Sequence, residues 1–415
     1  MRLSVLAALV LISFESPAAL GQTGMRDRYF TRYPFEQWKT EGAVSQLKWS
    51  PKVLPARLST QQRLVARVEA QIDSKELAKR RGRGELVILM ELADSAGRRF
   101  RTHETFDLSQ IPANAAARPI QFGQNILVTP GQYELTLAVC DSKNLEHSLV
   151  TKTIHVAPLH NDPLNGAWRD LPPVEFMRNY EPPDSWFQPY LRGKLWLPVT
   201  TSRPVHIDLM VNLTGSDRTA GSLRSFRRNM SVLVPSLKLV SGMTVQEGTL
   251  DITLLDLSKQ EFREQRNAHG VNWAGMREPF ASANPATVDV HSLAARAAMR
   301  RFFRDQLLEK LKADREKEPL RVIIVLGAPV FLEKQEKLEP APLQKDPGRK
   351  LFYIRYRPIL TPRNGGPMGD GIVPAIASDD LEGIIHSLDG RTFPVQTPED
   401  FRKALATIIG EISRM

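Results

Sequence analysis

The stretch Val205–Asp217, reading VHIDLMVNLTGSD, constrains the fold of this chain more than any other. It begins as an apolar run, Val205–Val211, and ends in a polar tip, Asn212–Ser216. A buried strand that leads into a loop of small hydroxyl and amide residues, followed by a helix, is how open α/β sheets form ligand sites at the carboxyl ends of their strands. The stretch therefore predicts a parallel sheet with a candidate binding site at this tip.

The rest of the C-terminal half, 195–415, follows the same pattern, because apolar runs alternate with amphipathic helical patterns. Further strands are predicted at Leu250–Leu255, Leu320–Leu326, Leu351–Arg357 and Thr392–Val395. Helices are predicted over 223–237, over Val290–Lys312, over Asp379–Leu388 and from Thr397 to the end of the chain. Pro235 should kink or end the first of these helices. Asp289 and Ser378 are the predicted N-caps of the second and third. This half is therefore predicted to be an α/β domain with helices on both faces of a Rossmann-like open sheet.

The N-terminal half has a different pattern. Residues 58–158 contain several short strands in which apolar and polar residues alternate, separated by Gly, Pro and Asp turns, as in an antiparallel β-sandwich. Residues 22–57 are predicted to be an irregular arm that packs onto a neighbour, and the Pro- and aromatic-rich segment 159–194 a linker that packs against one or both domains. An exposed aromatic patch for a partner is the alternative for this linker.

The first 21 residues are predicted to be a secretory signal peptide. A basic residue at Arg2, an apolar stretch from Leu3 to Phe14 and small residues ending at Gly21 are the three parts of such a signal. The apolar stretch is shorter than the roughly 20 residues that span a bilayer, and no later stretch is long and apolar enough to do so. The mature chain is therefore expected in the periplasm or outside the cell, without a transmembrane segment. Its lone Cys140 permits no internal disulfide and is expected to be a small core residue rather than a reactive thiol.

The net charge of +10 does not by itself identify a partner. The basic clusters are scattered, at 79–81, 98–99, 227–228 and 300–304, and aromatic residues are not interleaved with them. Proteins that bind single-stranded nucleic acid combine basic and aromatic residues in one groove. No nucleic-acid partner is therefore expected.

One segment of the N-terminal half resembles immunoglobulin-like and PKD-like modules. In Pro130–Asp141, a Pro-Gly turn precedes Tyr133, which is followed by an alternating strand and a second turn. The resemblance implies that Tyr133 forms a tyrosine corner, and that the module is a spacer or a binding surface.

The C-terminal half resembles the von Willebrand factor A-type (VWA) domain, most clearly in its closing unit. That unit reads DDLEGIIHSLDG, then RTFPV, then TPEDFRKALATIIGEI, between Asp379 and Ile412. The resemblance implies a metal-ion-dependent adhesion site at the tip of the first strand, with the motif Asp-x-Ser-x-Ser, a loop Thr and an Asp after the central strand.

In this chain, the metal-site positions fall on Asn212, Thr214 and Ser216. The hydroxyls are retained, the leading carboxylate is an amide, and the residues near Gly327-Ala328-Pro329 include no Asp; Thr287 is a candidate for the loop Thr. Hard cations need carboxylate ligands, so the three positions are interpreted as vestigial and no cofactor is expected, with Mg²⁺ or Ca²⁺ as the alternative. Asp208 and Asp217 are poor substitutes, because the first lies inside the strand and the second should cap the next helix.

The function expected from these patterns is non-catalytic protein binding or scaffolding by an exported, bacterial protein. The sequence has no GxSxG, HExxH, CxxC or P-loop motif, so no catalytic residue is proposed. Two alternatives stay open: metal-dependent adhesion through a remodelled site, and a hydrolase whose site is assembled only in space. The partner and the oligomeric state are not indicated by the sequence.

Overall fold

The computed structural model describes residues 28–82, 84–111, 120–177, 191–214, 223–282, 296–311, 320–330, 346–356 and 379–415. By their contacts these residues form two compact units, which we describe separately. The first unit contains the described residues up to Pro55, together with Arg67–Gln124 and Pro130–Ala157, and the second contains Ala56–Ala66, Asn125–Thr129 and Pro158–Met415. The prediction of a multidomain, β-rich chain with helices is confirmed at this coarse level.

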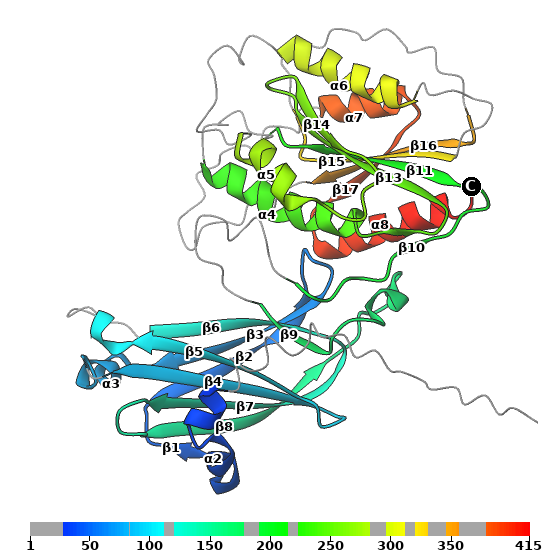
Figure 1. Cartoon of the computed structure of the whole chain (residues 1–415). Helices are drawn as coiled ribbons and strands as arrows, with labels where there is room; N and C mark the ends of the chain where they lie inside the picture. The colour runs from blue at the N-terminus through cyan, green and yellow to red at the C-terminus, as the bar shows by residue number, and fades with distance from the viewer. Residues whose placement is uncertain are drawn as a thin grey trace, which may run out of the picture. The chain divides into compact units, whose positions relative to one another are not determined.

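The first unit is built on a five-stranded antiparallel sheet with the order β1-β8-β7-β4-β5 (Figure 1). A four-stranded sheet, β2-β3-β6-β9, has residues in both units. The elements of this part of the chain are α2 (Phe35–Glu41), β1 (Val44–Ser45), β2 (Trp49–Leu58), β3 (Leu64–Ile72), α3 (Ser74–Lys79), β4 (Glu85–Asp94), β5 (Arg99–Asp107), the 3₁₀ turn η2 (Leu108–Gln110), β6 (Ile120–Val128), β7 (Gly131–Asp141) and β8 (His147–Val156).

The prediction that residues 22–57 form an irregular arm is wrong for the described part, which contains α2, β1 and most of β2. Strand β2 contains Pro51 and Pro55, and it is at the edge of its sheet, where a missing N–H is tolerated. The arm also packs onto its own chain. Phe35 and Trp38 of α2 are buried against Val87 of β4 and neighbouring residues of the five-stranded sheet.

The predicted linker, 159–194, includes the 3₁₀ turn η4 (Asn165–Trp168) and the short strand β9 (Val174–Phe176), which pairs with β6 at a sheet edge. Its residues 178–190 lie outside the described part of the chain. Trp168 is packed rather than displayed to solvent, since its Nε1 donates a hydrogen bond to the carbonyl of Gln62 at 2.8 Å, within the second unit.

The second unit contains a six-stranded sheet with the order β14-β13-β11-β15-β16-β17, in which all neighbours are parallel except β13 and β14. Its strands are β11 (Val205–Asn212), β13 (Gly248–Asp256), β14 (Glu261–Gln265), β15 (Leu320–Gly327), β16 (Arg349–Tyr356) and β17 (Arg391–Val395), and β10 (Pro198–Val199) pairs separately with β12 (Thr244–Val245). Its helices are α4 (Leu223–Val240), α5 (Trp273–Ser282), α6 (Arg296–Leu311), α7 (Asp380–Ser387) and α8 (Pro398–Ile412).

Helices cover both faces of this sheet (Figure 1). Alternate residues of β11 point to opposite faces, so that Ile207 and Leu209 pack with α4 and α8, whereas Met210 packs with α6 and α7. The apolar runs of the sequence are thus explained by strands that are buried on both faces.

Helix α4 continues past Pro235 to Val240, so Pro235 does not end the helix, as one of the two predicted outcomes had it. Proline inside a helix costs about 3 kcal/mol through its missing hydrogen bond. Met230, Leu233 and Leu237 on the buried side of α4 offset that cost by packing against the sheet.

The predicted cap of helix α7, Ser378, is wrong, because the N-cap of α7 is Asp379. Ser378 and the predicted N-cap Asp289 both lie outside the described residues.

Candidate functional site

The predicted tip of β11 lies at the carboxyl edge of the six-stranded sheet, next to the end of β15. The chain leaves β11 towards β13 on one side and returns to β15 on the other side, so the strand order reverses here. Such a switch point, outside the carboxyl ends of the strands, is where open α/β sheets bind ligands.

Asn212 and Thr214 are brought together at this tip, and their side-chain oxygens are already bound. Asn212 Oδ1 accepts a hydrogen bond from Thr214 N at 3.0 Å, and Thr214 Oγ1 accepts one from Leu257 N at 2.8 Å. Both groups therefore hold the backbone of the tip in place. The third predicted position, Ser216, lies outside the described residues, as do Thr287 and Asp217.

Gly327, at the end of β15, is the first of the positions where the resemblance places an Asp, and its surroundings explain why it is a glycine. A Cβ atom on Gly327 would lie 2.9 Å from the Cβ of Asn212, which is closer than real Cβ atoms approach. An aspartate at this position would therefore push β15 away from β11. The close approach of the two strands depends on glycine here.

A pocket of about 200 Å³ opens at the same edge, between α4 and α8. Its apolar lining is Leu213, Met230, Val232, Leu233, Ala328, Tyr356, Val395, Pro398 and Phe401. Its polar lining is Thr60, Gln62, Asn212, Thr214, Asn229, Ser236, Gln396 and Thr397. All these residues belong to the second unit, and none of the lining residues that the structure describes is an Asp, Glu, Lys, Arg or His.

Gln62 is the polar lining residue that sequence reasoning missed. It is fully buried, and its Nε2 donates a hydrogen bond to the carbonyl of Pro398 at 2.8 Å. Its Oε1 is also buried and has no hydrogen-bond partner among the described residues. The contact joins residues 336 positions apart. No local pattern in the sequence could have placed Gln62 at this site.

The backbone of Gln62 is held as firmly as its side chain. Its φ of 57° lies in the left-handed region, which is uncommon for residues other than glycine. Its carbonyl accepts hydrogen bonds from Trp168 Nε1 at 2.8 Å and from Arg402 Nη1 at 3.4 Å. Arg402 in turn is ion-paired with Asp162, with Nη2 and Oδ2 2.8 Å apart. Together with the hydrogen bond from Gln62 N to the carbonyl of Ser59, this network fixes the turn between β2 and β3.

Among the described residues that line the pocket, Tyr356 has an ionisable side chain. Burial raises the pKa of Tyr356 well above its ordinary value, and the neighbouring Ser236 hydroxyl lowers it in part. Ser236 Oγ donates its own hydrogen bond to the carbonyl of Val232 at 2.9 Å. Tyr356 therefore stays a neutral phenol, and the hydrogen-bonding groups of the described lining residues are neutral.

A second polar cluster lies at the opposite, amino end of β11, on the face covered by α6. Ligand atoms of His206, Asp208 and Asp251 lie within 4.8 Å of one another, as in many metal sites. His206 Nε2 is 3.3 Å from Asp208 Oδ2 and 3.7 Å from Asp251 Oδ2. These three are the residues that could hold a cation in this part of the structure.

Lys310 of α6 already supplies a positive charge to this cluster. Its Nζ lies 2.8 Å from Asp208 Oδ1, an ion pair without ideal hydrogen-bond geometry, and 2.5 Å from Glu264 Oε1. Burial acts to raise the pKa of Asp208, but His206 and Lys310 outweigh it, so this pKa is lowered. A metal ion would have to displace the Lys310 ammonium. The cluster is better explained as the ionic contact that holds α6 on the sheet.

Asp379 contacts the segment that follows β15. Its Oδ1 accepts hydrogen bonds from Val330 N and Leu381 N, both at 3.1 Å, and so joins β15 to the start of α7. Burial raises the pKa of Asp379 to about 6 although these hydrogen bonds lower it. The sequence signal for this role is an aspartate directly before an apolar helix.

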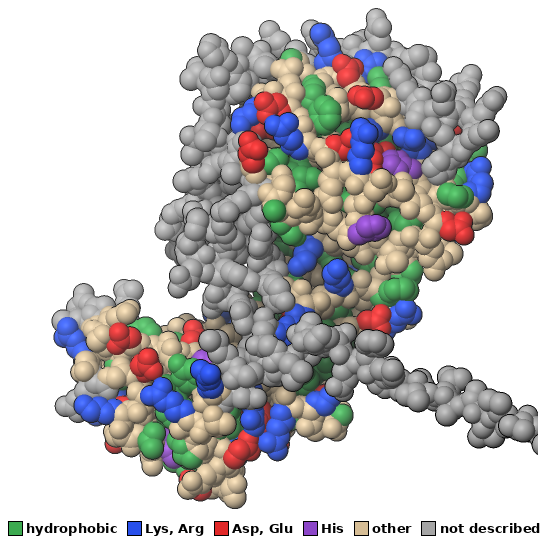
Figure 2. Space-filling model, in the orientation of Figure 1, with side chains coloured by type: hydrophobic (Ala, Val, Ile, Leu, Met, Phe, Trp, Pro, Cys, Tyr) green, Lys and Arg blue, Asp and Glu red, His purple; other side chains and the backbone are tan. Residues whose placement is uncertain are grey.

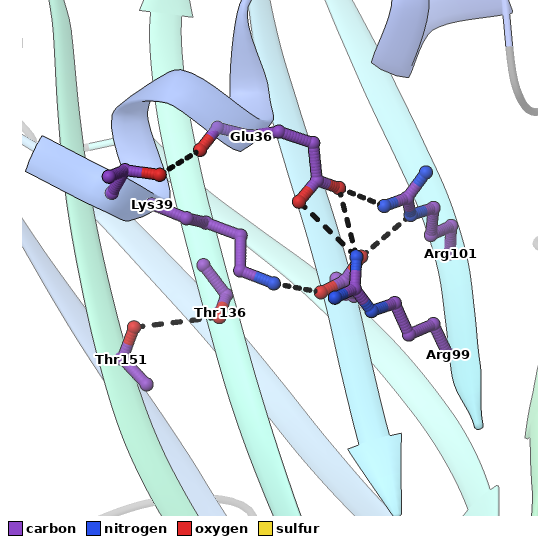
Figure 3. Close-up of polar contacts among 8 residues, drawn as sticks. Glu36, Lys39, Arg99, Arg101, Thr136 and Thr151 are labelled. Carbon is purple, nitrogen blue, oxygen red and sulfur yellow. Dashed lines mark hydrogen bonds and ion pairs between the residues drawn. The ribbon is translucent and has the colours of Figure 1, made fainter. Parts of the chain in front are cut away.

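The first unit has its own ionic cluster, which joins α2 to the sheet (Figure 3). Buried Glu91 of β4 pairs with Lys39 Nζ at 2.5 Å and with Arg101 Nε at 2.6 Å. Glu36 pairs with Arg101 and, at 3.2 Å, with Arg99. These charges are paired, so the cluster is explained as the ionic contact between α2 and the sheet.

Cys140 of β7 is fully buried in the first unit, and burial raises the pKa of its thiol to about 12. The thiol therefore stays protonated and unreactive at neutral pH, because the thiolate is the nucleophile.

Charges on the visible surface are mixed. Figure 2 shows Lys and Arg side chains interspersed with Asp and Glu rather than gathered into one patch. Among the described residues, no helix is both long and apolar enough to cross a membrane.

Comparisons with known proteins identify no family. No family model matches the chain, and no curated protein matches it. One similar solved structure is a target of the Northeast Structural Genomics Consortium, with 16% identity, a TM-score of 0.18, and coverage of 28% of this chain and 92% of that one. Another is a glycosyl hydrolase family 2 member from Bacteroides cellulosilyticus, with 8% identity, a TM-score of 0.20, and coverage of 69% of this chain and 37% of that one. TM-scores this low carry no argument about fold or function.

Proposed function

We propose that this chain is an exported, non-catalytic binding or scaffolding protein that holds a partner protein at the carboxyl edge of the six-stranded sheet. In this proposal the second unit is a VWA-like domain with a degenerate metal site, and the first unit is an immunoglobulin-like sandwich. The order of strands and helices in the second unit, and the capping box of Thr397 and Asp400 that opens its last helix, support the resemblance.

One observation carries the proposal: the site at the strand ends is built, buried and neutral. The pocket there is lined by apolar and uncharged polar side chains. The oxygens of Asn212 and Thr214 are bound to backbone donors, and a side chain at Gly327 would clash with Asn212. Divalent cations require charged oxygen ligands, so this edge is suited to protein contacts rather than to a metal ion.

The proposal is tested by capture of partners with the full mature chain, using two matched variants of α4. Val232 lines the pocket and is half-buried, whereas its neighbour Ser231 is exposed. Val232→Trp should fill the pocket and abolish capture from the native envelope fraction, while Ser231→Trp should leave capture unchanged. Both variants must first show the circular dichroism and melting behaviour of a folded chain. No specific capture by the unaltered chain or by Ser231→Trp would overturn the proposal.

A further inference from the structure

The cluster at the amino end of β11 has a feature that its ionic contact with α6 does not account for. In the register of the sheet, His206 lies opposite Thr249, and Asp208 lies opposite Asp251, so the four side chains share one face. Carboxylates that lie directly opposite one another in a sheet repel and destabilise it. The Lys310 ammonium approaches Asp208 at Oδ1, whereas Oδ2 of Asp208 lies on the side of His206. A cation placed among these atoms would remove the repulsion.

The distances within the cluster are those of metal ligands. His206 Nε2 is 3.3 Å from Asp208 Oδ2 and 3.7 Å from Asp251 Oδ2. Zinc binds nitrogen and oxygen at about 2.0–2.2 Å in a tetrahedron, which places its ligand atoms about 3.4 Å apart. The longer distance exceeds that of a hydrogen bond. Asp208 Oδ2 is buried and has no hydrogen-bond partner among the described residues. The three atoms therefore converge without forming a hydrogen-bonded network.

Two of these side chains are oriented through their other polar atom, as the ligands of metal sites usually are. His206 Nδ1 lies 2.6 Å from Thr249 Oγ1, and Asp251 Oδ1 accepts a hydrogen bond from Asn267 N at 2.9 Å. When Nδ1 donates to the Thr249 hydroxyl, Nε2 presents a lone pair to the two carboxylate oxygens. A lone pair that faces two anionic oxygens favours a bound cation.

A metal ion can reach the cluster and displace the ammonium. The side chains of His206 and Asp251 are 15% and 11% exposed, and that of Lys310 is 17% exposed, although Asp208 is fully buried. Lys310 Nζ also lies 2.5 Å from Glu264 Oε1. The ammonium therefore keeps an anionic partner when it leaves Asp208.

We propose that His206, Asp208 and Asp251 form a zinc site at the amino end of β11, in which the metal ion takes the place of the Lys310 ammonium beside Asp208. One imidazole nitrogen and two carboxylate oxygens suit zinc, and three protein ligands leave the fourth position to water. In the metal-free chain, the same cluster is the ionic contact that holds α6 on the sheet. Mg²⁺ and Mn²⁺ bind nitrogen ligands more weakly than zinc does, so neither should displace the ammonium.

The test is a calorimetric titration of the full mature chain with zinc chloride, after metal has been removed with EDTA and the chelator dialysed away. One equivalent of zinc should bind and raise the melting temperature, and Mg²⁺ should do neither. His206→Gln and Asp251→Asn should each weaken zinc binding at least about tenfold, since even changes outside the ligand set cost that much. Circular dichroism checks that both variants are folded.

The matched control is His386→Gln on α7. His386 is exposed, and its Nε2 lies 3.2 Å from Thr392 Oγ1, so it has a hydroxyl partner like that of His206. This variant should bind zinc as the unaltered chain does. A loss of affinity equal to that of His206→Gln would mean that zinc binds exposed histidines, and would overturn the inference.

Lys310→Ala tests whether the ammonium and the metal ion share one site. Removal of a positive charge a few ångströms away should strengthen zinc binding by about tenfold. Zinc should also restore part of the stability that this variant loses, because it binds only the folded chain. A purely ionic contact predicts neither result.

Three results would overturn the inference. The first is no zinc binding by the unaltered chain or by Lys310→Ala. The second is zinc affinity that His206→Gln and Asp251→Asn leave unchanged. The third is zinc binding by Lys310→Ala alone, which would show that the ammonium fills the position permanently. None of them bears on partner capture at the carboxyl edge, since the cluster lies at the opposite end of β11.

Discussion

The two ends of β11 differ in the buried polar groups that they contain and in how those groups are stabilised. At the amino end, Asp208 is fully buried and is balanced by the ammonium of Lys310 and by His206. At the carboxyl end, Asn212 is nearly as buried, but it is uncharged and bonds to Thr214 N. Buried charges are stable only when they are paired, whereas buried amides need only hydrogen bonds. The charged end is thus explained by stability, and the neutral end is available for recognition.

The largest expected effect is on the charged end. Lys310→Ala should lower the free energy of unfolding by roughly 3 kcal/mol, because removal of one partner leaves Asp208 as a buried carboxylate with weaker compensation. Urea denaturation at pH 7 measures the change. The matched control is Lys403→Ala at an exposed position of α8, which should change the free energy by less than about 0.5 kcal/mol. A Lys310→Ala loss no greater than that of the control would show that the cluster does not hold α6.

A smaller effect is expected at Asp379, near the carboxyl end of the sheet. Its pKa of about 6 lies above its ordinary value, so the folded chain takes up a proton at higher pH than the unfolded chain. Stability should therefore rise as the pH falls from 7 to about 4. Asp379→Asn keeps the acceptor oxygen but removes the charge, and should be more stable than the unaltered chain by about 1–2 kcal/mol at pH 7.

The control for Asp379 is the pH dependence itself. The advantage of Asp379→Asn should vanish at about pH 4, where the unaltered residue is protonated in the folded state. The pH dependence of stability that Asp208 contributes has the opposite sign. Its lowered pKa gives stability that is present above about pH 4 and is lost as the pH falls further. A pH-independent difference between the two chains would contradict the raised pKa of Asp379.

The smallest expected effect is the response to metal at the neutral end. Asn212→Asp restores one carboxylate, but Gly327 cannot be given a second without a clash. Millimolar Mg²⁺ or Mn²⁺ should therefore shift the melting temperature of neither the unaltered chain nor Asn212→Asp, since a ligand stabilises only in proportion to its binding. Micromolar Mg²⁺ affinity of Asn212→Asp by calorimetry would reveal an acidic ligand that the described structure does not show.

Much of the second unit was predictable because its strands are buried on both faces and its helices have one apolar side. The strand predicted over Val205–Val211 is found at Val205–Asn212, and the one predicted over Leu320–Leu326 at Leu320–Gly327. The predicted irregular arm was wrong where tertiary context outweighs local preference, as in β2, which tolerates proline at a sheet edge.

The site was only partly predictable. The polar tip at Asn212 and Thr214 follows from an apolar run that ends in small polar residues. Gln62 reaches the same site from a distant part of the chain, where it donates a hydrogen bond to the carbonyl of Pro398. Lys310 likewise meets Asp208 only once α6 is packed on the sheet. Contacts of this kind have no local signature, so the sequence predicts the framework of the site but not its recognition groups.

In the proposed function, the carboxyl end of the sheet binds a partner through neutral groups without a metal ion. The most direct measurement is partner capture by the full mature chain in EDTA and in millimolar Mg²⁺. Equal capture under the two conditions is expected. Capture that is lost in EDTA and restored by Mg²⁺ would contradict the proposed function.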